Sequence, residues 1–149
     1  MEKFIGMYEP YAYAILRIVT GLLFFCHALQ KLFGMFGGVG GAAVPIASLL
    51  GIGGLIELVT GPLITVGLFT GTAAFIASGE MAVAYFIGHF PQSFWPVENG
   101  GEPAVLNCFI FLYMATQGSG MWSLDAVRQG LTNDEVMHRR VNARQQTLR

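Results

Sequence analysis

The sequence predicts an all-α integral membrane protein: a four-helix bundle of up-down topology with both termini in the cytoplasm. Composition is the first observation behind this prediction. The chain is 54% hydrophobic and only 11% charged, whereas a soluble domain carries about 25% charged residues. The shortage of charge indicates that much of the surface faces lipid. The second observation is four long apolar stretches, and the third is the placement of Lys and Arg near the chain ends.

Each apolar stretch has the length of a membrane-spanning helix. A span needs about 20 mostly apolar residues, and runs of this length are too long for buried strands. The predicted spans are residues 11–33, 46–69, 71–90 and 104–122. They are joined in order by a glycine-rich uncharged loop, a tight turn and a longer loop, at residues 34–45, 69–72 and 91–103.

The basic residues predict the orientation in the membrane. The two longer loops contain no Lys or Arg and carry Glu98 and Glu102. Because cytoplasmic segments carry an excess of Lys and Arg, both chain ends are expected in the cytoplasm. This divides the chain into a membrane domain, residues 1–128, and a basic cytoplasmic tail, residues 129–149. The basic residues at the two ends are Lys3, Arg128, Arg139, Arg140, Arg144 and Arg149.

Ionisable side chains inside the predicted spans carry the most information. A charge near the bilayer centre costs about 2.5–3.5 kcal/mol on insertion scales. Such residues persist where they face the bundle interior, find a partner or take part in chemistry. The first span carries Arg17, His27 and Lys31, which fall on one side of a helix that turns by about 100° per residue. This basic stripe is expected to face inward.

The second and third spans each carry an acid near the middle. Glu57 lies four residues after Gly53 and four before Gly61, and small residues let a neighbouring helix approach closely. Alanines flank Glu80 in the same way. Both acids are therefore expected to face the interior beside the basic stripe. With His89 near the outer boundary, these groups form a polar ladder from the outer face toward the bilayer centre.

Two interpretations of this ladder compete. It is a functional site, or it is a set of buried salt bridges that only fixes helix packing. Lys31 taken alone fits an interfacial anchor whose ammonium snorkels toward water. No metal site is predicted, because His27 and His89 lie on different spans without metal-ligand spacing. Cys26 and Cys108 lack a C-x-x-C arrangement and are expected to be ordinary buried thiols.

A combination of motifs runs through residues 11–128. It comprises RIVTGLLFFCHALQKLFG at 17–34, GGLIELVTGPLITVGLFT at 53–70, FPQSFWPVENGGE at 90–102 and GSGMWSLDAVR at 118–128. Together these segments resemble the DoxX family of four-helix inner-membrane proteins. The sequence departs from the family pattern at Ala28, where many members have Gly. It departs again at Gly71, where a basic residue is usual, which weakens the orientation signal at that turn.

The resemblance implies a multi-pass protein of the bacterial inner membrane. Relatives include a membrane subunit of a thiosulfate:quinone oxidoreductase, and others are linked to quinone or thiol-oxidant resistance. The leading hypothesis is therefore the membrane component of a quinone-linked or thiol/sulfur-linked redox system, with a quinone as an exogenous ligand and no cofactor of its own. A redox partner protein would supply the electrons. The expected catalytic residues are His27, Glu57 and Glu80, and the expected quinone-binding residues are Arg17, His27, Lys31 and His89.

Two other function classes stay open. One is a non-catalytic membrane scaffold or accessory protein, in which the same charges only fix the packing. The other is a small-solute or proton transporter, in which the ladder forms the path. Nucleic acid is not expected as a partner, because no basic stripe interleaves with aromatic residues in a folded region. The lipid bilayer is the expected surrounding, and a homo-oligomer is compatible with the sequence.

Overall fold

The computed structural model describes residues 6–136 and 138, and within them the protein is all-helical. Three helices are long and apolar enough to cross a membrane. They are α2 (Glu9–Phe33), α3 (Leu49–Val66) and the stretch Thr70–His89, in which α4 (Thr70–Ala84) continues into the π-helix η2 (Tyr85–His89). The predicted basic residues Lys3, Arg139, Arg140, Arg144 and Arg149 lie outside the described residues.

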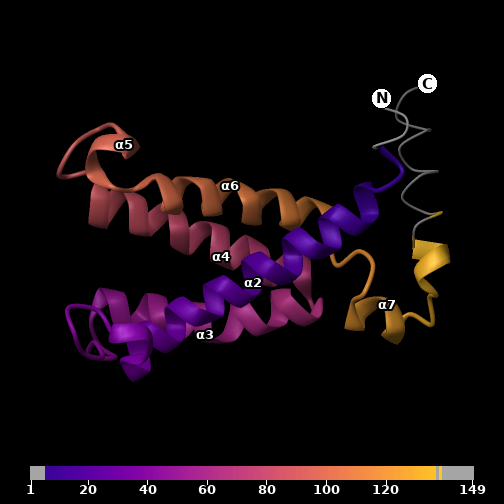
Figure 1. The fold of residues 1–149 in the computed structure, drawn as a ribbon, viewed down its shortest axis with the longest axis horizontal. Helices are drawn as coiled ribbons and strands as arrows, with labels where there is room; N and C mark the ends of the chain where they lie inside the picture. Colours follow the sequence, from indigo (N-terminus) through magenta and orange to yellow (C-terminus); the bar gives the residue numbers. More distant parts are fainter. Residues whose placement is uncertain (1–5, 137, 139–149) are drawn as a thin grey trace.

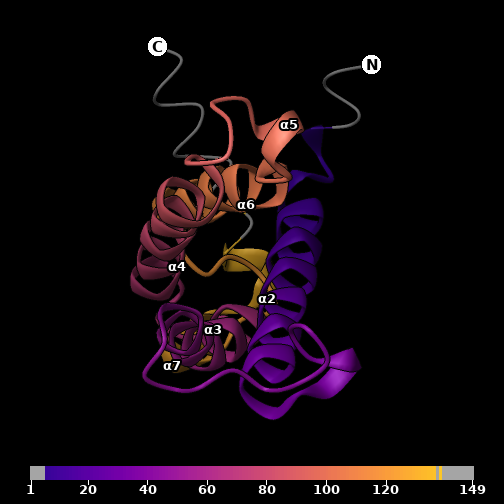
Figure 2. The same ribbon diagram turned by 90° about the vertical axis from the view of Figure 1, so that its left-hand side faces the viewer.

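A fourth helix, α6 (Glu102–Gln117), completes a ring of long helices. Figure 2 shows α2, α3, α4 and α6 arranged around a common axis. Packing is most extensive between α2 and α3 and between α4 and α6. The α2–α3 and α4–α6 connections lie together at one end of the molecule, which we call the cavity end (Figure 1). The α3–α4 turn and α7 (Leu124–Arg128) lie at the other end, which we call the α7 end.

Local sequence explains where these helices begin and end. Pro10 lies in the first turn of α2, and Gly34 ends that helix in the left-handed conformation with φ of 68°. Only glycine adopts this conformation without a steric cost from a Cβ atom. Ser48 caps α3, because its hydroxyl accepts a hydrogen bond from the Gly51 amide at 3.0 Å. The second span is therefore shorter than the predicted range of 46–69.

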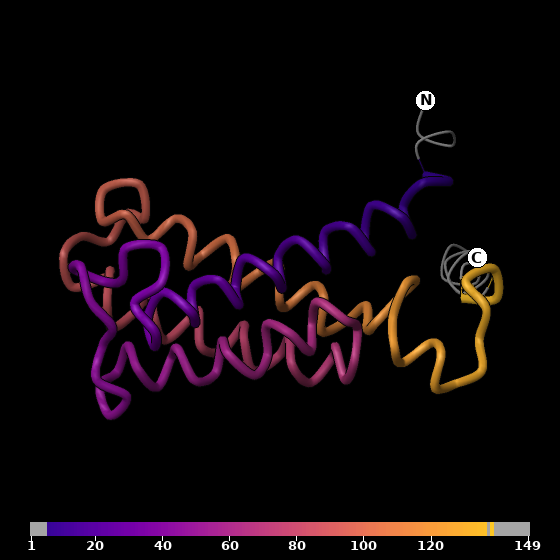
Figure 3. The backbone as a smooth tube through the Cα atoms, turned by 60° about the horizontal axis from the view of Figure 1, so that its bottom comes forward, coloured from indigo at the N-terminus to yellow at the C-terminus, as the bar shows by residue number. Residues whose placement is uncertain are grey.

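The fourth predicted span, residues 104–122, is wrong at its end. Helix α6 stops at Gln117, because Gly118 and Gly120 both adopt positive φ values of 69°. The chain then leaves the helix axis and passes the α3–α4 turn, as the tube in Figure 3 shows. There the amide of Asp125 donates a hydrogen bond to the carbonyl of Gly67 at 3.1 Å. The end of the predicted span thus belongs to a packed connection.

The two loops at the cavity end are more ordered than predicted. The connection at 34–45 contains the short 3₁₀ helix η1 (Met35–Gly37) and an isolated bridge between Val39 and Ala42. The loop predicted at 91–103 contains the four-residue helix α5 (Pro96–Asn99). These turns join α2 to α3 and η2 to α6 at the cavity end (Figure 1).

Close backbone contact joins α2 to α3. A Cβ atom on Gly21 would lie 2.7 Å from the Thr65 backbone nitrogen, and one on Gly61 would lie 2.8 Å from the Phe25 nitrogen. Only glycine permits this approach at both positions, in the manner of small-residue packing between membrane helices. Large apolar side chains point outward instead, among them Leu23, Val59, Phe75 and Phe109, each at least 58% exposed. Such an apolar outer surface suits a lipid environment.

Candidate functional site

A cavity of about 440 Å³ lies among the four long helices near the cavity end. Its lining comes from the C-terminal half of α2, the N-terminal half of α3, the end of α4 with η2, and the first turns of α6. Phe24 is the lining residue of α2 nearest its N-terminus, and its ring packs on Phe111 with centroids 4.6 Å apart. Both rings of this pair are buried, and Phe24 marks the side of the cavity that faces the α7 end. Most of the wall is apolar.

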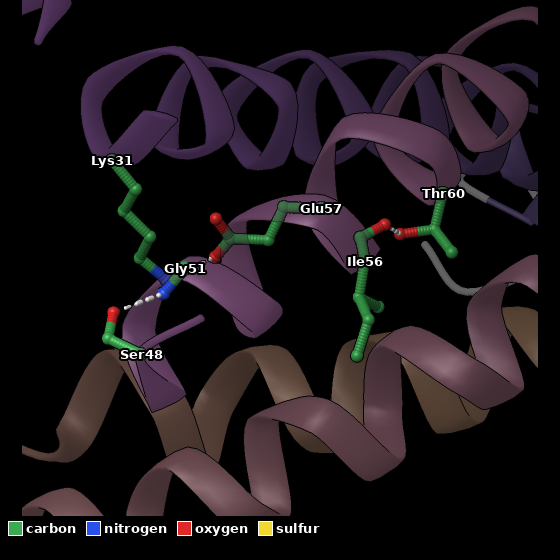
Figure 4. Close-up of polar contacts among 6 residues, drawn as sticks. All are labelled: Lys31, Ser48, Gly51, Ile56, Glu57 and Thr60. Carbon is green, nitrogen blue, oxygen red and sulfur yellow. Dashed lines mark hydrogen bonds and ion pairs between the residues drawn. The ribbon is translucent and has the colours of Figure 1, made fainter. Parts of the chain in front are cut away.

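An ion pair lies in this apolar wall. Lys31 Nζ on α2 donates to Glu57 Oε1 on α3 at 2.8 Å, and Figure 4 shows the two side chains turned toward one another. The Glu57 side chain is 2% exposed and that of Lys31 is 15% exposed. The interpretation of Lys31 as a snorkelling anchor is therefore wrong, because its ammonium turns inward to a buried carboxylate. The pair compensates two charges that would each be costly in a bilayer.

A second carboxylate shares this site. Glu80 on α4 lines the same cavity and lies within electrostatic range of both Lys31 and Glu57. A Cβ atom on Gly53 would lie 2.9 Å from Glu80 Oε1 and 3.8 Å from Lys31 Nζ. The three ionisable groups thus gather over a glycine that leaves room for them. Two of their buried oxygens, Glu57 Oε2 and Glu80 Oε2, have no hydrogen-bond partner among the described residues.

Both predicted histidines line the cavity as well. His27 is exposed and lies on α2 one turn before Lys31, whereas His89 is partly buried. His89 Nδ1 lies 3.0 Å from the Asn99 carbonyl oxygen. A carbonyl only accepts, so Nδ1 carries the proton and a neutral His89 ring keeps Nε2 as an acceptor. The π-helical turn of η2 sets where His89 projects, and such turns recur at functional sites.

Arg17 lies away from the cavity, at the α7 end. Its Nη1 donates to the carbonyls of Ile64 and Thr65, each at 2.6 Å, and its Nη2 donates to those of Trp122 at 2.8 Å and Met121 at 3.3 Å. The residue is fully buried. The structure therefore splits the predicted basic stripe: His27 and Lys31 border the cavity, and Arg17 ties the end of α3 to the segment that follows α6.

The comparisons with known proteins place the sequence in a family. The DoxX family model matches residues 12–90, which cover most of α2 and all of α3, α4 and η2. The chain belongs to the DoxX family. It is also 42% identical over 125 residues to an uncharacterized protein of Haemophilus influenzae, with 79% of this chain and 91% of that protein covered. No solved structure matches.

All six predicted site residues lie within the segment that the family model matches, and all of them except Arg17 line the cavity. The five that line it are His27, Lys31, Glu57, Glu80 and His89. Sequence reasoning missed Asn107 on α6, which also lines the cavity and lies beyond the matched segment. A polar amide in an apolar run was the signal that could have identified it. Cys26 and Cys108 are free thiols and do not line the cavity.

Proposed function

We propose that this DoxX protein crosses the bacterial inner membrane four times, with both termini in the cytoplasm. Helix α6 has 16 residues and spans about 24 Å at a rise of about 1.5 Å per residue. Tilt and local thinning of the bilayer accommodate a short span at modest cost. Arg128 lies at the α7 end, over the ring of Phe69 at 5.0 Å, whereas Glu98 and Glu102 lie at the cavity end. This charge distribution supports a cytoplasmic α7 end.

Within that membrane, the protein serves as the quinone-binding component of a redox system. The observation that carries this proposal is an apolar cavity of about 440 Å³ with a buried Lys31–Glu57–Glu80 cluster in its wall. A quinone combines an apolar ring and tail with polar oxygens, and ligand pockets commonly pair apolar walls with a few placed polar groups. The proposed site comprises His27, Lys31, Glu57, Glu80 and His89.

The lining groups suit the proton demands of quinone chemistry. Reducing a quinone to a quinol consumes two electrons and two protons. His27 is the candidate proton donor to an oxygen of the ring, and Lys31 stabilises negative charge that develops on that oxygen. Glu57 and Glu80 orient these groups and exchange protons with them. The electrons come from a redox partner protein, and Arg17 has no part in the proposed site because its guanidinium is bound to backbone carbonyls.

A binding experiment tests this function. The protein is purified in mild detergent, and binding of a short-tailed benzoquinone is measured at equilibrium for the wild type and for His27→Ala. Wild-type protein is expected to bind, and His27→Ala is expected to bind more weakly. His138→Ala serves as the matched control, because His138 is exposed and does not line the cavity. A wild-type protein that neither binds the added quinone nor carries quinone in its extracted lipid would contradict the proposal.

A scaffold function is the second candidate, and one observation favours it. The Lys31–Glu57 ion pair joins α2 to α3 directly, as a packing device would. Under this alternative, Glu57→Gln unfolds the protein. No variant is then expected to stay folded and lose only ligand binding. A folded Glu57→Gln protein with altered quinone binding would instead support the redox function.

A further inference from the structure

We propose that the cavity recognises a ligand head group that donates hydrogen bonds, and that it therefore binds a quinol in preference to the corresponding quinone. This inference rests on the proposed function, because it concerns the same cavity. Quinone and quinol share one ring and one tail. They differ at the ring oxygens, which only accept hydrogen bonds in the quinone and can also donate them in the quinol.

Glu57 is the first residue that favours a donor. Its Oε1 accepts a charge-assisted hydrogen bond from the Lys31 ammonium at 2.8 Å, and this contact favours the carboxylate form. An ionised carboxylate only accepts hydrogen bonds. The residue is only 1% exposed, and its Oε2 has no hydrogen-bond partner within the described part of the chain. A hydroxyl group of a bound ligand would supply the missing donor.

The same atom argues for a neutral donor. Lys31 already supplies a positive charge to Glu57 across 2.8 Å. Among the described residues, Glu57 Oε2 has no hydrogen-bond donor facing it. A neutral hydroxyl group would donate a hydrogen bond without bringing another charge into an apolar wall. A quinone carbonyl placed there would set two acceptors against each other.

Two further acceptors lie in the lining. Glu80 Oε2 is a second buried oxygen without a partner among the residues described. His89 donates its Nδ1 hydrogen to the Asn99 carbonyl, which leaves Nε2 as an acceptor in a ring that carries one proton. The Lys31 ammonium is the main donor of the cluster, and one of its hydrogens is taken by Glu57. The unpartnered oxygens of Glu57 and Glu80 are thus matched to ligand hydroxyl groups. Helices α2 and α6 add further polar groups to the lining, which are His27 and Asn107.

A preference for the quinol has a measurable redox consequence. If the quinol binds more tightly than the quinone, reduction of the bound quinone becomes more favourable. The midpoint potential of the bound couple is then higher than that of the free couple. A buried acceptor left without a donor costs enough to change affinity about tenfold. For a two-electron couple, a tenfold preference raises the midpoint potential of the bound couple by about 30 mV.

The test compares one short-tailed benzoquinone with its own quinol, under anaerobic conditions, on the full chain in mild detergent. We expect wild-type protein to bind the quinol about tenfold more tightly. In Glu57→Gln, Lys31 holds the amide oxygen, and the amide NH₂ takes the place of Oε2. The preference for quinol is expected to fall toward unity, because a donor now faces the ligand. Glu80→Gln provides a second variant should Glu57→Gln fail to fold, and the exposed Glu102→Gln is the matched control.

The outcomes separate this inference from the function on which it rests. If neither form binds to the wild type, the proposed function fails and the inference fails with it. If both forms bind equally, or the quinone binds more tightly, the donor-recognition inference is overturned while quinone binding stands. Retention of the full quinol preference in both folded Gln variants would also overturn it. A preference lost in the Gln variants and kept in Glu102→Gln supports it.

Discussion

Buried charge is compensated differently at the two ends of the molecule. At the α7 end, the fully buried Arg17 guanidinium donates to four backbone carbonyls drawn from α3 and from the segment after α6. At the cavity end, Lys31 and Glu57 pair with each other, and a buried oxygen of Glu57 is left without a partner in the described chain. At the α7 end, backbone carbonyls bind the charged side chain. At the cavity end, polar side-chain atoms line a cavity.

This difference separates a packing residue from a ligand-facing one. Placing polar groups in a membrane interior is costly unless hydrogen bonds compensate them. Where backbone carbonyls supply that compensation, as they do for both terminal nitrogens of Arg17, the side chain acts in packing. Where capacity remains beside an open volume, as for Glu57 and Glu80, a ligand can supply the missing bonds. Burial alone does not distinguish the two cases, since Arg17 and Glu57 are both buried.

The largest effect is expected at the α7 end. Arg17→Met keeps an apolar stem of similar reach but removes the donors to the carbonyls of Ile64, Thr65 and Trp122. Carbonyls that lose their partners in the interior are expected to lower the free energy of unfolding by about 3 kcal/mol or more. Denaturant titration in detergent micelles measures this change.

Arg128→Met is the control for Arg17→Met. Arg128 is exposed, and its side chain contacts the Phe69 ring at 5.0 Å, a contact worth about 0.5–1 kcal/mol at an exposed site. Equal loss of stability in the two variants would show that the carbonyl contacts of Arg17 do not matter more than a surface contact, and the contrast between the two ends would disappear.

An intermediate effect is expected for the ion pair at the cavity end. Lys31→Met leaves the Glu57 carboxylate buried without its counter-ion, so it should destabilise the protein more when Glu57 is present than in a Glu57→Gln background. A double-mutant cycle on the free energy of unfolding is expected to give a coupling of about 1–3 kcal/mol. The pair Asp125–Arg128 is the control, because its atoms are 3.8 Å apart and Arg128 is 60% exposed.

The control cycle is expected to give a coupling below about 0.5 kcal/mol. A Lys31–Glu57 coupling no larger than that value would mean that the two side chains do not hold α2 and α3 together. The scaffold alternative would then lose the observation that favours it.

Much of the fold could be predicted because it depends on local sequence. The first span was expected to begin at residue 11 and begins at Glu9, and both the prediction and α2 end at Phe33. Hydropathy and glycine placement determine those limits. The predicted fourth span extends five residues beyond α6, because hydropathy does not show that Gly118 and Gly120 leave the helix. Their positive φ values take the chain out of the helix to the α3–α4 turn, where the Asp125 amide donates to the Gly67 carbonyl, and that turn lies far away in the sequence.

The site could be predicted only in part, for a related reason. Helical projection placed Glu57 and the basic stripe on inward faces, and Glu57 is indeed buried. Whether Lys31 or Arg17 meets that acid depends on the relative height and rotation of α2 and α3, which a projection of one helix does not contain. The partners of Arg17 are backbone carbonyls, and carbonyls leave no residue-specific mark in a sequence.

The smallest effect is expected from a glycine that makes room for the cluster. In Gly53→Ala, the new Cβ atom would lie 2.9 Å from Glu80 Oε1, so the carboxylate must move. Because the crowded atom ends a flexible side chain, and because Ala favours the helix by up to about 1 kcal/mol over Gly, stability is expected to change by less than about 1 kcal/mol.

Ligand binding should respond to Gly53→Ala more than stability does. A displaced Glu80 carboxylate is expected to weaken binding of the short-tailed quinol about tenfold, which corresponds to about 1.4 kcal/mol. Gly79→Ala is the matched control, because Gly79 also lines the cavity but its Cβ would meet no atom within 4 Å. If both alanines leave binding unchanged, the position of Glu80 is irrelevant to the ligand. The unpartnered oxygens at the cavity end would then have no role in ligand binding, and they would differ from the Arg17 contacts only in their partners.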